Sequence, residues 1–132
     1  MKPIMNSAWE DGLARADTGT PFFESMLAQI LLILGVLPVL ISLGLLAYFV
    51  HPSDAILVLH YNVYFGVDLL GLWWQAYVLP LLGLFFVLMH ALLARRLYNE
   101  TERIASYLLL FSSSVLSCGL LVATVSIAFI NY

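Results

Sequence analysis

The sequence contains very little charge for its length. Only 10% of its 132 residues are Asp, Glu, Lys or Arg, whereas about a quarter are charged in a typical soluble domain. Hydrophobic residues make up 63% of the chain, so there are too few polar side chains to cover a water-soluble globule. These proportions exclude an ordinary soluble enzyme and a disordered tail, and they indicate an integral membrane protein.

Basic residues and cysteine are also scarce. Five Lys and Arg stand against eight Asp and Glu, giving a net charge of −3. No basic surface is therefore available for nucleic acid, and we expect no nucleic-acid partner. The single cysteine, Cys118, lies in an apolar run, which excludes an internal disulfide and a zinc site built from cysteines.

Three long apolar runs dominate what is present. Residues 26–50, 70–93 and 104–130 are each long enough to cross a membrane as a helix. We predict an all-α integral membrane protein with three transmembrane helices. The remaining segments are an N-terminal tail (1–25), a first connector (51–69), a second connector (94–103) and a short end (131–132).

The basic residues predict the orientation of these helices. All five of them fall in the tail or the second connector: Lys2, Arg15, Arg95, Arg96 and Arg103. Because basic loops stay on the cytoplasmic side, the N-terminus is expected in the cytoplasm and the C-terminus outside. The connector 51–69 is then extracytoplasmic.

The predicted spans contain no Asp, Glu, Lys or Arg. Charged residues at membrane depth mark proton relays and ion paths, so their absence argues against a transporter or pump that works alone. His90 lies one turn before Arg95 and is interpreted as an interfacial residue at the cytoplasmic edge. One such histidine does not provide the axial ligands of a haem, and no cofactor is predicted.

The first connector differs in kind from the spans. Residues 55–67 are β-branched and aromatic, and polar side chains recur with period two at His60 and Asn62. This pattern predicts an extended strand at the membrane face; a small hairpin, or a strand dipping into the headgroups, is the alternative. Gly66 is expected to end the strand, and Asp68 to cap the following helix.

This connector also carries the candidate interaction residues, which are His60, Tyr61, Asn62, Tyr64, Phe65, Gly66 and Asp68. The spacing of its histidines and carboxylates matches no familiar metal motif, and Asp54 is also explained as a turn residue. Ser53 lacks a nucleophile motif. We therefore predict neither a metal site nor a catalytic residue.

Small residues recur every seven positions along the predicted helices, which places them on one face. The sets are Ala28, Gly35 and Ser42 in the first, Ala76 and Gly83 (with His90 next in phase) in the second, and Ala105, Ser112, Gly119 and Ser126 in the third. Such stripes let helix backbones approach closely in lipid. The third stripe is the strongest prediction of a packing face. The run Ser112–Ser114 with Ser117 is interpreted as packing rather than as a polar pathway.

The segment from His60 to Asp68, with Tyr61, Asn62, Phe65 and Gly66 between them, resembles one shared by small, uncharacterised bacterial membrane proteins with three helices. It is also similar to the first extracytoplasmic loop of immunity proteins against the sporulation-delay toxin, although Val58 stands where that family has proline. The resemblance implies the same topology and a bacterial cytoplasmic (inner) membrane. It implies no activity.

These observations predict a non-catalytic membrane protein that acts as an accessory or scaffold subunit. Its partners would be the lipid bilayer and either other membrane proteins or a second copy of the chain. A sensor or immunity protein that recognises an extracytoplasmic ligand through residues 55–74 is the alternative. Transport by an oligomer with serine stripes facing a shared axis is a third hypothesis.

Overall fold

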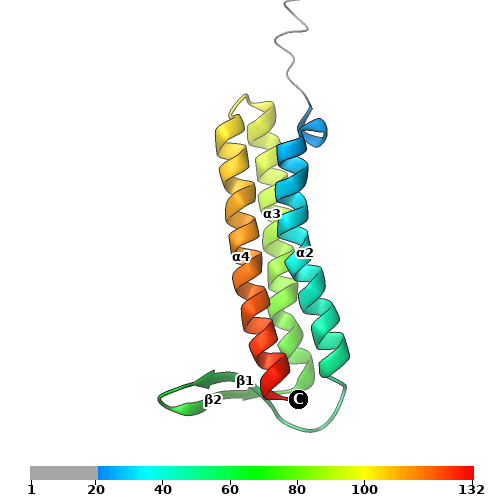
Figure 1. Cartoon of the computed structure of the whole chain (residues 1–132), viewed down its shortest axis with the longest axis vertical. Coiled ribbons are helices and arrows are strands. Elements are labelled where there is room, and N and C mark those ends of the chain that lie inside the picture. The colour runs from blue at the N-terminus through cyan, green and yellow to red at the C-terminus, as the bar shows by residue number, and fades with distance from the viewer. Residues whose placement is uncertain (1–20) are drawn as a thin grey trace, which may run out of the picture.

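The computed structural model describes residues 21–132 and forms a three-helix bundle with a small β-hairpin at one end (Figure 1). The helices are α2 (Met26–Phe49), α3 (Val78–Asn99) and α4 (Arg103–Ile130). The hairpin consists of β1 (Leu57–Asn62) and β2 (Gly66–Gly71). Short 3-10 turns, η1 (Phe22–Glu24) and η2 (Trp73–Tyr77), precede α2 and α3. Most of the predicted tail 1–25, including Lys2 and Arg15, lies outside the described residues.

All three helices are long and apolar enough to span a membrane. At about 1.5 Å per residue, even the 22 residues of α3, the shortest of the three, extend about 33 Å, more than the ~30 Å of a hydrocarbon core. The fold is thus mostly helical with three candidate spans, as the sequence predicted.

The second helix begins later than predicted. Residues 70 and 71 belong to β2, and η2 follows before α3 starts at Val78. This start places Pro80 in the first helical turn, where its missing N–H costs no hydrogen bond. The helix also continues to Asn99, so Arg95 and Arg96 belong to its last turns rather than to a loop.

Small and hydroxyl side chains make up much of the interior of the bundle, beside buried Leu46, Leu110 and Ile127, whereas most large apolar side chains are exposed. α4 packs against both other helices, and α2 and α3 contact each other less. Its buried face includes Ser106, Ser113, Ser114, Ser117 and Thr124. The Ser114 hydroxyl lies 3.0 Å from the Leu31 carbonyl of α2, and the Ser106 hydroxyl donates to the Ala94 carbonyl of α3 at 2.8 Å. Serines therefore connect the helices, and most of the large apolar side chains point outward, which is compatible with a lipid environment.

The predicted stripes on the first two helices do face this interior. Ala28, Gly35 and Ser42 are buried in α2. Ala76 in η2 and Gly83 in α3 are buried as well. A Cβ atom on Gly83 would lie 3.2 Å from the Val39 side chain and 3.3 Å from the Leu120 side chain, so the α3 backbone packs closely against side chains of α2 and α4.

The third stripe does not lie in the interface between the helices. Ser112, Gly119 and Ser126 are exposed and Ala105 is half-buried, while the buried face of α4 begins one residue later, at Ser106 and Ser113. Neighbouring positions on a helix differ by about 100°, so the seven-residue pattern is present but points outward. Contact of this stripe with another chain stays a prediction.

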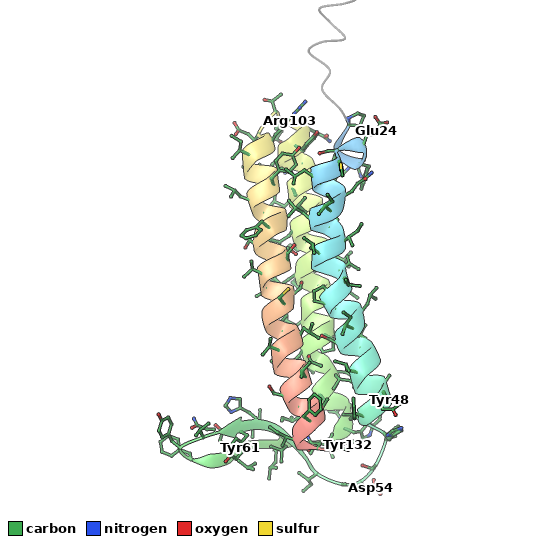
Figure 2. All side chains as sticks on the ribbon, in the orientation of Figure 1. Glu24, Tyr48, Asp54, Tyr61, Arg103 and Tyr132 are labelled. Atoms are coloured by element: carbon green, nitrogen blue, oxygen red, sulfur yellow. The ribbon has the colours of Figure 1, made fainter. Side chains whose placement is uncertain are left out.

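Charged side chains gather at the two ends of the bundle. Figure 2 shows Glu24 and Arg103 at one end, and Asp54, Tyr61 and Tyr132 at the other. At the first end the Arg95 guanidinium lies 5.3 Å from the ring centre of Phe23, and Arg103 lies 5.2 Å from that of Tyr98. Such cation–π contacts hold the basic groups at the edge of the apolar surface. All basic residues among positions 21–132 lie at this end.

Candidate functional site

The hairpin extends sideways from the bundle, across the end where α4 terminates (Figure 1). Its strands are antiparallel, pairing Leu57 with Gly71 and Asn62 with Gly66. The segment 55–67 is therefore not one extended strand, and the hairpin alternative is correct. No third strand pairs with either edge within residues 21–132.

Two of the predicted interaction residues form the turn of this hairpin. The Asn62 side-chain oxygen accepts a hydrogen bond from the Tyr64 backbone N–H at 2.9 Å, an arrangement typical of Asx turns. Gly66 has φ +79°, a conformation that glycine adopts without the steric cost of a Cβ atom. The conformation of the turn therefore explains the presence of Asn62 and of Gly66.

His60 and Asp68, eight positions apart in sequence, are brought together across the two strands. The imidazole Nδ1 lies 2.6 Å from the carboxylate Oδ1, and both side chains are substantially exposed to the surroundings. The pairing register shifts on both sides of His60, which leaves Leu59 and Asp68 without register partners. Asp68 therefore lies within β2 and pairs with His60; it does not cap the next helix as predicted.

The His60–Asp68 pair can bind a polar group, since a carboxylate and an imidazole nitrogen lie side by side and are exposed. It does not complete a metal site, because residues 21–132 contain no group of three His, Cys, Asp or Glu positioned to hold an ion. His51 and Asp54 of the same connector are not part of the pair.

The tip of the hairpin exposes three consecutive apolar side chains. Val63, Tyr64 and Phe65 are 84%, 90% and 83% exposed. We call these three residues the tip. Tyr64 and Phe65 were predicted interaction residues, and Tyr61 on β1 is about half exposed. Exposed apolar side chains that are clustered in this way mark interaction surfaces.

Asn131 fixes the hairpin to the bundle, a role that the sequence did not reveal. Its side-chain oxygen accepts from the Val58 N–H, and its side-chain nitrogen donates to the Val58 carbonyl, both at 2.8 Å. The same nitrogen donates to the Ile127 carbonyl of α4 at 2.8 Å. The amide therefore pairs with β1 as a short strand would. The only sequence signal is an amide residue directly after the third apolar run.

A groove of about 750 Å³ separates the hairpin from the helices beside it. One wall comes from the strands, with Leu59, Leu69 and Leu70, and the other from Val78 of α3 and Ile127 of α4. His60, Gln75 and Ser126 add polar groups to the otherwise apolar lining. This volume lies within the range of small-molecule sites in proteins, ~300–1,000 Å³.

Comparisons with known proteins find no matching family model, no similar curated protein and no similar solved structure.

Proposed function

We propose that the chain is a non-catalytic membrane protein that serves as an accessory or scaffold subunit of a membrane complex. The observation that carries this proposal is the tip: three large apolar side chains that are more than four-fifths exposed. The Asn131 contacts hold the hairpin that presents them. Aromatic side chains in such a position are the usual anchors of a protein interface.

The proposed location is the cytoplasmic membrane of a bacterium, with the N-terminus in the cytoplasm. The tip would then meet its partner on the extracytoplasmic side. Support comes from the three candidate spans and from the positions of Arg95 and Arg96 in the last turns of α3 and of Arg103 at the start of α4, at the end away from the hairpin.

The experiment is purification in mild detergent from the native membrane at endogenous expression, with the mass of the complex and the co-purifying proteins recorded. We expect a stoichiometric membrane-protein partner. The double variant Tyr64→Ser with Phe65→Ser should lose it. The matched control is Tyr48→Ser, which removes an aromatic ring that is 73% exposed at the same end of the bundle. A lone protein, or a partner that the tip variant retains, contradicts the proposal.

A second candidate is recognition of an extracytoplasmic ligand, as in a sensor or immunity protein. It is favoured by the exposure of Tyr61, Tyr64 and Trp74 around the same hairpin. Loss of a ligand response in Tyr61→Ala and Tyr64→Ala, with normal expression, would support it. An unchanged response in both variants would exclude it.

A further inference from the structure

The groove between the hairpin and the bundle has an apolar lining, which lies at the ends of α3 and α4 that face the hairpin. Val78 is the first residue of α3, and Ile127 and Ile130 lie in the last turn of α4. In a protein whose helices cross a membrane, these turns lie where acyl chains meet headgroups. The surroundings of the groove are then lipid, and a lipid is the occupant with the highest local concentration.

The polar groups at the groove restrict the kind of headgroup. His60 contributes to the lining. Asp68 is not itself a lining residue, but its carboxylate Oδ1 lies 2.6 Å from the His60 Nδ1, at the rim of the groove. Among residues 50–77, which form this end of the molecule, the charged residues are Asp54 and Asp68, and none is Lys or Arg. An anionic headgroup would meet carboxylates without a basic side chain, whereas a headgroup that carries an ammonium beside its phosphate complements this pair.

We propose that the groove binds one phospholipid whose headgroup carries both a phosphate and a primary ammonium. One acyl chain lies along Val78, Ile127 and Ile130. The ammonium donates to the Asp68 carboxylate, which also accepts from the His60 Nδ1–H, and the phosphate lies against the polar side chains of the lining, Gln75 and Ser126. A primary ammonium donates hydrogen bonds and a quaternary one does not, so the site distinguishes ethanolamine from choline headgroups. This inference is independent of the proposed partner, because the tip does not line the groove.

The test is native mass spectrometry of the purified, delipidated protein titrated separately with dioleoyl phosphatidylethanolamine, phosphatidylcholine and phosphatidylglycerol. We expect one tight adduct with phosphatidylethanolamine, bound about tenfold more tightly than the other two. Asp68→Asn keeps the shape of the side chain and removes its charge, and it should reduce the affinity for phosphatidylethanolamine to that for phosphatidylcholine. Equal binding of the three lipids to the unmodified chain overturns the proposal.

A second arm tests the position of the lipid. Val78→Trp fills the groove from a half-exposed position, and Ala123→Phe fills it from α4 should the first variant not fold. Either should lower the affinity for phosphatidylethanolamine about tenfold. The control Val122→Trp adds the same ring at a more exposed position of α4 that does not line the groove, and it should bind as the unmodified chain does. Unchanged binding in the folded groove variant contradicts the assignment.

The tip variant separates this inference from the proposed function. Tyr64→Ser with Phe65→Ser should keep lipid binding whether or not a protein partner exists. Loss of the lipid in this variant would show that the adduct lies at the tip and would overturn the groove assignment.

Discussion

Asn131 connects α4 with the hairpin through a single side chain, at both hydrogen-bonding groups of the Val58 backbone. A hairpin of two strands is marginally stable by itself, so these two hydrogen bonds are a large part of its stability. Each is expected to contribute about 0.5–1.5 kcal/mol.

We therefore expect Asn131→Ala to release the hairpin while the helices stay packed. Amide hydrogen exchange of residues 57–71 should become faster, by roughly tenfold if one net hydrogen bond's stabilisation is lost, and that of α2 should be unchanged. Tyr132→Ala, which removes an exposed ring next to Asn131, is the control. Protection of β1 equal to that of the unmodified chain would show that the amide contacts do not hold the hairpin.

Thr101 is the one residue other than glycine with positive φ in the described chain, at 69°. It follows α3 in a Schellman arrangement, in which the Glu102 N–H donates to the Leu97 carbonyl at 3.0 Å and the Thr101 N–H to the Tyr98 carbonyl at 3.3 Å. Glycine is the usual residue at this position because a Cβ atom is strained there.

Thr101→Gly should therefore stabilise the protein by about 0.5–1 kcal/mol, since relief of strain exceeds the added freedom of the unfolded chain. The measurement is the midpoint of thermal unfolding in mild detergent. Thr101→Ala, which keeps the Cβ atom, should not stabilise. A lower midpoint for the glycine variant would mean that the hydrogen bond from the Thr101 hydroxyl to the Glu100 carbonyl outweighs the strain.

At the scale of elements, the stripe of small residues on α4 is exposed, whereas the stripe on α3 packs against the other helices. Nothing lies within 4 Å of a Cβ atom built on Gly119, whereas Gly83 faces Val39 and Leu120. A substitution at Gly83 therefore tests packing within the bundle, whereas a substitution at Gly119 tests association with another chain.

Gly83→Leu should destabilise the bundle by about 1–3 kcal/mol, because side chains and backbones must shift to accept it. Gly119→Leu should leave the unfolding midpoint unchanged and weaken any complex that uses the outer face of α4. Thermal unfolding and the mass of the native complex measure the two effects. A large loss of stability in Gly119→Leu would contradict the position of this face.

The sequence predicted the helices well because a span has to be long and uniformly apolar. It predicted the faces less well, because a seven-residue spacing defines a stripe without saying what the stripe touches. In α4 the stripe through Ser112 and the buried one through Ser113 have the same period. Only the positions of α2 and α3 decide between them.

The sequence predicted only part of the candidate site, because composition shows which residue types are present and not what they contact. The exposed aromatic tip and the polar residues of the connector are visible in composition. The turn was not, because the three residues between Asn62 and Gly66, which are Val63, Tyr64 and Phe65, are all strand formers. Contacts such as that of Asn131 with Val58, 73 positions apart, depend on the tertiary fold.

At the scale of the whole molecule, the bundle has one end with basic side chains and one with the hairpin. The positive-inside rule then predicts the orientation. In a Cys118→Ser background, a cysteine at exposed Asp54 should react with a membrane-impermeant maleimide in intact cells. A cysteine at Asn99 should react only after permeabilisation. The reverse pattern would place the hairpin in the cytoplasm.

The central position of α4 has a consequence for biogenesis. Because α2 and α3 contact each other far less than each contacts α4, the two helices that are synthesised first would have little to hold them together in a bilayer. They would stay loosely associated until residues 103–130 pack against both of them. The same late segment carries Ile127, which bonds with the Asn131 amide that fixes the hairpin. Folding of both the bundle and the hairpin would thus depend on the arrival of α4, and a protease would meet the chain in its least protected form just before α4 packs.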